Sequence, residues 1–311
     1  MIDEKENQDP DPLSEDEVKE LEKRERKAEK ERRAAAKNAK RSSEESRAAL
    51  RRKVKIFYDL QKLRIQAAGR GKPKGKKNPV QLLGADVAVL DQRSKELRSL
   101  EARALNDIRD HLATEKLWTD IISADRDRFK GFAETMTAVL IAEVDITACS
   151  TVSKLWAYAG LAPVPAMRCK ACRDEVVEDD TNASFKHRYN RQNKCAVKHP
   201  GPSDVYESSA AMKPTKGQKL PFNRWLKTKM VGVAATNLLR SGSPYRKFYD
   251  DYKHRITCAG RGVSDGHRHR MALRYMIKMF LLDVWREWRA AEGLDVRAPY
   301  QEEYLGHKHA S

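Results

Sequence analysis

The stretch TVSKLWAYAGLAPVPAMRCKAC, residues 151–172, contains the change of pattern that decides the fold. Its first half is an apolar and aromatic run that reads as a helix and ends in a Gly-Leu-Ala-Pro corner. Its second half, from Pro163, leads into two cysteines separated by two residues. We expect Leu155, Trp156 and Tyr158 to be core residues. The stretch therefore predicts a packed helical corner that passes directly into a different kind of structure.

The cysteines belong to a metal-ligand pattern. Cys169 and Cys172 form a C-x-x-C pair, and Cys195 and His199 follow after 22 intervening residues as C-x-x-x-H. Two short pairs separated by a loop suit tetrahedral zinc, and four protein ligands make the site structural. The polar loop between the pairs has little else to fold around, so metal binding would order it. His187 is the rival fourth ligand, and unpaired thiols in a loop are the alternative.

The charge balance points to a polyanionic partner. The chain has 62 Lys and Arg against 45 Asp and Glu, a net charge of +17, and basic side chains neutralise phosphates. Nucleic acid is the simplest partner, with an acidic membrane surface as the weaker alternative. No apolar run approaches a membrane span, and the N-terminus has no secretory or transit pattern. Five cysteines, an odd number, suit a reducing compartment. We predict a cytoplasmic, intracellular location and no membrane partner.

The N-terminal third divides into two regions. Residues 1–54 are charged and almost without large apolar residues, which predicts disorder or a lone helix. Residues 55–116 form a helical arm with a basic loop at 69–79. Between residues 41 and 78 there are 13 Lys and Arg against 3 Asp and Glu, typical of an arm that tracks phosphates or of a solvated linker. The apolar stripe expected to pack this arm is Ile56, Leu60, Leu63 and Ile65.

A long amphipathic helix is predicted over residues 81–117. It could pair with a partner helix or with a second copy, which makes a homo-oligomer through this helix an expectation. The alternative for residues 84–91 is a short strand presenting Asp86 and Asp91 to a metal.

Residues 117–164 are predicted to be helix-hairpin-helix-like, with a turn at 129–132 that contains Gly131. Such a turn can offer backbone amides to a phosphate, although an ordinary helical corner is the more frequent explanation. The core face of the second helix is expected to be Met136, Val139, Leu140 and Val144.

The C-terminal half comprises a zinc-binding insertion, residues 165–212, and a basic helical region, residues 213–311. The latter has 20 Lys and Arg against 9 Asp and Glu. Its expected core residues are Leu226, Met230, Val233, Leu238, Met276, Phe280, Leu281, Val284 and Trp288. The residues predicted to contact phosphates are Lys216, Lys219, Arg224, Lys227, Lys253, Arg255, Arg268 and Arg270. His267 and His269 are expected to contact phosphate rather than metal, and Asp265 is a predicted helix N-cap. A solvated face is the alternative.

Together these patterns predict a mainly α fold. It comprises long N-terminal helices, a helix-hairpin-helix, a small zinc-ribbon-like insertion and a C-terminal helical domain.

Five segments resemble, in order, the C-terminal transposase domain of the IS-one-ten, or DEDD, insertion-sequence transposases. They are LIAEVDI (140–146), TVSKLWAYAGLAP (151–163), GQKLPFNRWLKTKMVGVAATNLL (217–239), SPYRKFYDDYKHR (243–255) and DGHRHRMALRYMIKMFL (265–281). The resemblance covers about residues 115–309. It implies a DNA recombinase module of a prokaryotic or phage-like mobile element. In complete family members this module works with a ribonuclease-H-like domain that bears an acidic tetrad, a serine nucleophile and a guide RNA.

Two features depart from that family. The first 115 residues show no run of strands bearing carboxylates, so magnesium would enter only with an acidic nuclease domain supplied in trans. The place of the nucleophilic serine is taken by VPAMRCKACRDE, which leaves Ser208 and Ser209 as weak candidates. Lys213 or Lys216 could give these serines an electropositive pocket.

The sequence thus predicts a transposase-like DNA-binding protein that takes part in DNA transposition by strand exchange. The alternative is a non-catalytic, transposase-derived binder of DNA or a guide RNA. A third reading is a coiled-coil scaffold built on residues 15–117, which would bind DNA weakly and insensitively to salt.

Overall fold

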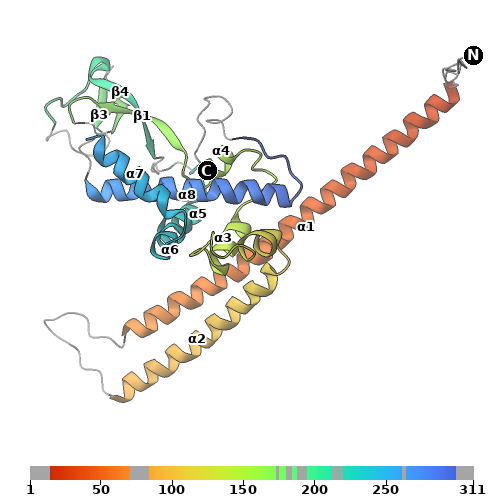
Figure 1. Cartoon of the computed structure of the whole chain (residues 1–311), viewed down its shortest axis with the longest axis horizontal. Coiled ribbons are helices and arrows are strands. Elements are labelled where there is room, and N and C mark those ends of the chain that lie inside the picture. Colours follow the sequence, from red (N-terminus) through yellow and green to blue (C-terminus); the bar gives the residue numbers. More distant parts are fainter. Residues whose placement is uncertain are drawn as a thin grey trace, which may run out of the picture. The chain divides into compact units, whose positions relative to one another are not determined.

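The computed structural model describes residues 15–70, 84–172, 175–179, 184–187, 195–211, 217, 220–260 and 264–298. These residues form a mainly helical fold with one small antiparallel sheet (Figure 1), as the sequence predicts. The chain divides into two compact units, Met1–Ala49 and Leu50–Ser311. Of the predicted basic loop, residues 69 and 70 end the first helix, and 71–79 lie outside the described residues. Among the described helices, none has an apolar stretch long enough to cross a membrane.

The N-terminal unit contains the first part of helix α1 (Glu15–Arg70). Exposed ion pairs form between residues one helical turn apart: Arg33 pairs with Glu29 (2.5 Å) and Arg41 with Glu45 (3.0 Å). Such pairs each add only tenths of a kcal/mol, about 0.2–0.5. This part of α1 is the charged helix that the sequence offered as one of two outcomes. The helix continues without a break across the predicted boundary between residues 54 and 55.

In the second unit, α1 contributes a different stripe from the one expected. Ile56, Leu63 and Ile65 are at least half exposed. The buried residues are Leu50, Val54 and Phe57, spaced as i, i+4 and i+7. Of the expected stripe, Leu60 is partly buried and packs against the core. The other three residues are wrong, because the buried face of the helix starts at Leu50 and Val54, before residue 55.

Helix α2 (Gly84–Leu112) confirms the long amphipathic helix, and the strand alternative for residues 84–91 is wrong. Glu101 of α2 accepts hydrogen bonds from Gln61 (3.1 Å) and Arg64 of α1, and Lys53 donates to the Asp107 carbonyl oxygen (3.0 Å). Ala104, Ile108 and Leu112 are buried near the C-terminal end of α2. These contacts connect the two helices.

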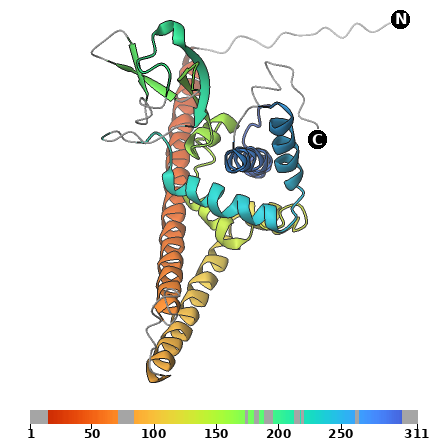
Figure 2. The same ribbon diagram turned by 90° about the vertical axis from the view of Figure 1, so that its left-hand side faces the viewer.

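The remaining helices gather around α8 (Asp265–Ala291), which Figure 2 shows nearly end-on in dark blue. The π-helical turn η1 (Leu117–Ile122), α4 (Val152–Tyr158), the π-helical turn η4 (Thr228–Ala234), α6 (Ala235–Arg240) and α7 (Arg246–Cys258) all contact it. Helices α3 (Glu134–Glu143) and α5 (Arg224–Lys227) complete this part. The N-cap of α8 is Ser264, one residue before the predicted Asp265.

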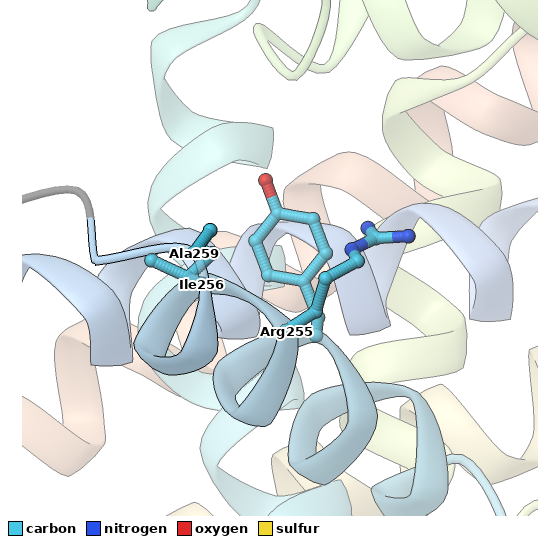
Figure 3. Close-up of a pocket in the computed structure, with 4 residues that line it drawn as sticks. Arg255, Ile256 and Ala259 are labelled. Carbon is cyan, nitrogen blue, oxygen red and sulfur yellow. The ribbon is translucent and has the colours of Figure 1, made fainter.

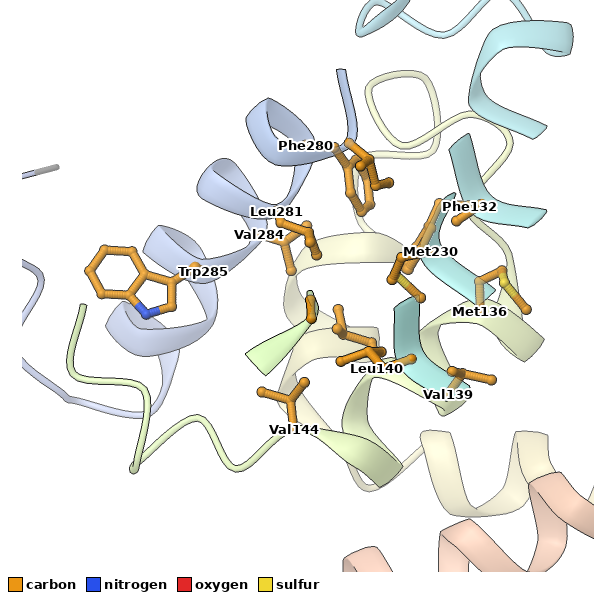
Figure 4. Close-up of a cluster of buried hydrophobic side chains, with 14 of the residues drawn as sticks. Phe132, Met136, Val139, Leu140, Val144, Met230, Phe280, Leu281, Val284 and Trp285 are labelled. Carbon is orange, nitrogen blue, oxygen red and sulfur yellow. The ribbon is translucent and has the colours of Figure 1, made fainter. Parts of the chain in front are cut away.

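Figure 4 shows how the core closes between α3, η4 and α8. The predicted core faces of these elements are buried except Val233, which is half-buried. Phe280 lies among aromatic rings, with its centroid 4.6 Å from that of Phe132 and 5.1 Å from that of Tyr245. Trp285 is buried and donates its indole N–H to the Cys149 carbonyl oxygen (2.8 Å), so this large side chain leaves no donor unsatisfied.

The predicted hairpin turn at 129–132 is a tight packing corner. Gly131 has φ of +92°, and a Cβ placed on it would lie 2.7 Å from the Asn237 carbonyl oxygen and overlap Ser241 Oγ. The Ser241 hydroxyl donates to the Lys130 carbonyl oxygen (2.9 Å). Arg128 beside the turn pairs with Asp283 (3.4 Å) of α8. The turn is therefore held against α6 and α8, and the close approach of Asn237 and Ser241 requires glycine at residue 131.

The opening stretch folds in two parts that meet at Pro163. The Thr151 hydroxyl caps α4 by accepting from the Lys154 N–H (3.4 Å). At the other end, Gly160 has φ of +66° and its N–H bonds the Ala157 carbonyl oxygen, while the Leu161 N–H bonds that of Trp156. These two bonds are a Schellman C-cap, which explains the glycine of the corner. Leu155 and Trp156 are buried as predicted, whereas Tyr158 is exposed, which corrects its assignment to the core.

The described strands all lie between Pro163 and Ala211 and form one sheet, in the region of the predicted insertion. It comprises β1 (Pro163–Cys169), β2 (Glu175–Asp179), β3 (Ser184–His187) and β4 (Val205–Ala211), in the order β3-β2-β1-β4 with antiparallel neighbours. Strand β1 begins at the corner, and its last residue, Cys169, lies opposite Val205.

The two ends of the insertion meet at its base. The Asn223 N–H donates to the Tyr158 carbonyl oxygen (2.8 Å), and the Asn223 amide donates to the Tyr158 hydroxyl (3.1 Å). A Cβ on Gly160 would lie 2.7 Å from the Phe222 ring. The chain thus leaves the helical part at α4 and returns to the same place at the start of α5.

Candidate metal centre and nucleic-acid interface

Four side chains at one end of the sheet form a group that could hold a metal ion. The Sγ atoms of Cys169, Cys172 and Cys195 and a ring nitrogen of His187 all lie within 4.8 Å of one another. The Cys169 and Cys195 sulfurs are 3.8 Å apart, and Cys172 Sγ lies 3.3 Å from His187 Nε2. Tetrahedral zinc with bonds of about 2.3 Å to sulfur requires sulfur atoms about 3.8 Å apart. The donor set and its spacing therefore fit such an ion.

Strand register explains why His187 completes the group. His187 pairs with Val176 of β2, which in turn pairs with Met167 of β1, so the histidine lies in line with the residue two before Cys169. His199, the fourth ligand first expected, is exposed and stands outside the group. The correction follows from pairing between β2 and β3, which the cysteine spacing does not reveal.

The surroundings of Cys169 favour its thiolate. Burial raises the pKa of this thiol, but hydrogen bonds from the backbone N–H groups of Cys172 and Ala171 and from the His187 ring outweigh burial and lower its pKa to about 7. Metal binding needs the thiolate, so a lowered pKa reduces the proton cost of loading the site. His187 Nδ1 is buried and has no hydrogen-bond partner within the described residues.

A row of basic residues lies along one face of α8. His267, Arg270, Arg274 and Lys278 follow one another at intervals of three or four residues, and we call this set the α8 basic stripe. Burial and then Arg274 lower the pKa of Lys227 of α5, and Arg168 of β1 is one of the charges that, after burial, lower the pKa of His267, so both neighbours lie close to the stripe. The stripe thus unites residues from α8, the sheet and the start of α5.

The electrostatics of the stripe are unfavourable in the protein alone. Burial, followed by the charges of Arg270, Arg168 and Arg274, lowers the pKa of His267. Burial and then Arg270 lower the pKa of Arg274, and burial lowers that of Lys278.

These positive charges are left without acidic partners. Within the described part of the chain, Arg270, Arg274, Lys278 and Lys227 form no ion pair with a carboxylate. Lys227 and Lys278 instead lie over aromatic rings, 4.4 Å from the centroid of Phe222 and 4.2 Å from that of Trp156. Like charges held together at half-buried positions favour a bound anion.

The residues predicted to contact phosphates divide into three groups. Lys227 and Arg270 join the stripe region. Arg224 and Arg255 are exposed elsewhere, Lys253 is half-buried on α7, and Arg268 pairs with Asp265 (2.6 Å). Lys216 and Lys219 lie outside the described residues, as does Lys213. His269 is engaged with Tyr249, whose hydroxyl is 2.7 Å from His269 Nδ1. Sequence reasoning missed Arg168, Arg274 and Lys278, although the last two continue from Arg270 at helical spacing.

The serine candidates lie on β4, the edge strand paired with β1. Arg168 Nε donates to Ser208 Oγ (3.2 Å), so an electropositive group does face this hydroxyl. Of the described side chains, Arg168 is the one that hydrogen-bonds Ser208, and a guanidinium does not accept a proton. Ser209 pairs through its backbone with Pro165. Among the side chains that the structure describes, the arrangement around Ser208 supplies an anion-binding group and no base.

Comparisons with protein-family models, with curated proteins and with solved structures each find no match to this chain.

Proposed function

We propose that this chain binds DNA through its phosphate backbone, with the α8 basic stripe as the centre of the contact. The observation that carries the proposal is the set of half-buried cations, Arg274, Lys278 and Lys227, that repel one another or lie desolvated without a carboxylate partner in the described part of the chain. A phosphate placed among them would offset that repulsion. The net charge of +17 extends the attraction beyond the stripe.

The test is DNA binding measured as a function of salt. A labelled duplex is titrated with wild-type protein and with the double variant Arg270→Gln, Arg274→Gln, using fluorescence anisotropy at several salt concentrations. The slope of log K against log salt is negative, and each lost phosphate contact should reduce its magnitude by about 0.9, so the double variant should reduce it by about 2.

A matched control comes from α2. The double variant Arg93→Gln, Arg98→Gln removes the same charge from two exposed positions. Its salt slope should stay near that of the wild type. An equal loss of slope in both double variants would show that net charge alone accounts for binding, and would overturn the role of the stripe.

For the metal group we propose structural zinc. Cys169, Cys172, His187 and Cys195 supply four soft or borderline ligands, and the sulfur spacing agrees with tetrahedral geometry. Metal analysis of the purified protein should give one zinc per chain. Cys169→Ser and His187→Ala should lose the metal, whereas His199→Ala should keep it. Retained zinc in the His187 variant together with loss in the His199 variant would reverse the ligand assignment.

Strand exchange is the second candidate function, favoured by the hydrogen bond between Arg168 and Ser208 beside the stripe. We propose binding ahead of cutting because a serine nucleophile needs a proton acceptor as well as positive charge. Cleavage of a candidate terminal DNA is tested with Ser208→Ala, Ser209→Ala. Cleavage that disappears in the double variant supports the enzyme, and binding without cleavage under every metal tried supports the non-catalytic binder.

A further inference from the structure

A second surface beside the stripe combines aromatic rings, a cation and a small cavity. Phe248, Tyr252 and Arg255 recur at helical spacing on one face of α7, and Ala259 follows at its C-cap. Tyr252 stacks on Tyr275 of α8, with ring centroids 4.6 Å apart and planes inclined by 19°. Tyr275 also meets Phe248 edge to face at 6.4 Å. Both tyrosines are half-buried, so part of each ring remains accessible.

Arg255 adds an exposed positive charge to these rings. Its guanidinium carbon lies 4.9 Å from the centroid of Tyr252 and 5.7 Å from that of Tyr275. No carboxylate of the described residues pairs with Arg255, so its donors are available to an anion. A cation held over stacked rings presents a flat π surface next to a phosphate-binding group.

A cavity of about 140 Å³ opens beside this group. In the described part of the chain its walls come from Tyr252, Arg255, Ile256 and Ala259. Figure 3 shows Arg255, Ile256 and Ala259 at the C-terminal end of α7, with the Arg255 side chain pointing away from the other two. The walls are thus an aromatic ring and aliphatic groups, with one charged residue. A flat apolar group linked to an anion matches this lining.

We propose that Tyr252, Tyr275 and Arg255 form a stacking platform for an unpaired base of a DNA strand, with the Tyr252 cavity receiving the base and Arg255 contacting a neighbouring phosphate. The proposal rests on the DNA binding proposed above. Base stacking on aromatic side chains together with a cationic track is the usual basis of single-strand binding. The α8 basic stripe, which lies on the same helix as Tyr275, would supply that track.

The experiment compares strands that differ only in their bases. Labelled 15-residue oligo-dT and an abasic 15-mer with the same phosphates are titrated with wild-type protein, with Tyr252→Leu and with Tyr252→Phe. We expect the wild type to prefer oligo-dT and the leucine variant to lose about 5- to 150-fold in affinity for it. Affinity for the abasic strand should be unchanged, and the phenylalanine variant, which keeps the ring, should behave as wild type. Tyr206→Leu, at an exposed tyrosine of β4, is the control and should have no effect.

A crosslink gives a readout that does not depend on a substitution. Oligo-dT carrying one 5-iodouracil is irradiated with wild-type protein, and the attachment site is mapped by mass spectrometry. A crosslink at Tyr252 or Tyr275 supports the platform, whereas crosslinks confined to other aromatic residues overturn it.

The outcomes separate the two proposals. Wild-type protein that binds neither strand at low salt overturns the platform, and overturns DNA binding itself if the duplex is not bound either. Equal affinity for oligo-dT and the abasic strand overturns the platform and leaves phosphate binding standing. Tighter binding of oligo-U than of oligo-dT overturns the choice of DNA as the strand.

Discussion

Replacing Gly131 by alanine should destabilise the second unit strongly, because two separate costs meet at this residue. Its φ of +92° lies in the left-handed region, where a residue with a Cβ loses about 1–2 kcal/mol. The new Cβ would also lie 2.7 Å from the Asn237 carbonyl oxygen and overlap Ser241 Oγ. The Asn237 atom is backbone and cannot rotate away, so overpacking should add about 1–3 kcal/mol. We expect the free energy of unfolding to fall by roughly 2–5 kcal/mol.

Gly242 supplies a matched control. Its φ is +68°, and a Cβ placed there would meet nothing within 4 Å. Gly242→Ala should therefore cost only the backbone part, about 1–2 kcal/mol. A third variant, Gly232→Ala, changes a glycine with open space and ordinary φ, and should leave stability unchanged or slightly raised.

Urea unfolding of the zinc-loaded protein, followed by circular dichroism at 222 nm, measures these differences. For a domain of this size each kcal/mol shifts the melting temperature by about 2–4 °C, so thermal scans give a second readout. Adding Ser241→Ala to Gly131→Ala should restore part of the loss, because it removes one of the two overlaps. Equal urea midpoints for Gly131→Ala and Gly242→Ala would refute the packing argument.

Three further predictions concern titratable groups. With zinc bound, a thiol reagent should react quickly with exposed Cys258 and slowly with Cys149, because burial raises the pKa of Cys149 to about 11. A chelator should then make three more thiols reactive, and five fast-reacting thiols in the zinc-loaded protein would contradict the site. Histidine NMR should give His267 a pKa below its usual value, and adding duplex DNA should raise that pKa because phosphates offset the neighbouring arginines; an unchanged pKa would place the DNA elsewhere. Burial lowers the pKa of Lys229, which lies over the rings of Tyr58 and Trp225, to about 8. The unfolded chain holds that proton up to about pH 10.4, so this lysine should make the free energy of unfolding increase as the pH rises from about 8 to about 10.4. In an NMR titration, one lysine resonance that titrates near pH 8 should be absent from the spectrum of Lys229→Arg.

Helical periodicity predicted most of the core. In α3, η4 and α8 the apolar residues recur at intervals that place them on one face, and the structure buries those faces. The first stripe of α1 was missed because Leu50 and Val54 are embedded in a run of charges that resembles a solvated helix. The glycine corner at Gly160 was visible as a break, but its cap required knowing where α4 ends.

The metal group was predictable in type and only partly in membership. The C-x-x-C pair gives two ligands directly, since one turn brings both sulfurs together. The fourth ligand depends on a strand register, and the sequence between Cys172 and Cys195 has too little alternation to fix it. The stripe could be predicted only in part from the sequence. Arg270, Arg274 and Lys278 recur at helical spacing on one helix, whereas Arg168 joins them only through the fold of the sheet.

The contact between Tyr158 and Asn223 brings the two ends of the sheet-containing segment to one place on the helical part, so this segment is an inserted module. The ends of an inserted segment that meet at one point can be joined by a short linker without moving the parts they leave behind. A chain with residues 163–220 replaced by a few glycines and serines should still close its helical core. The strands that carry the metal group would then be dispensable for the helical core, and removing them would also remove Arg168 from the stripe.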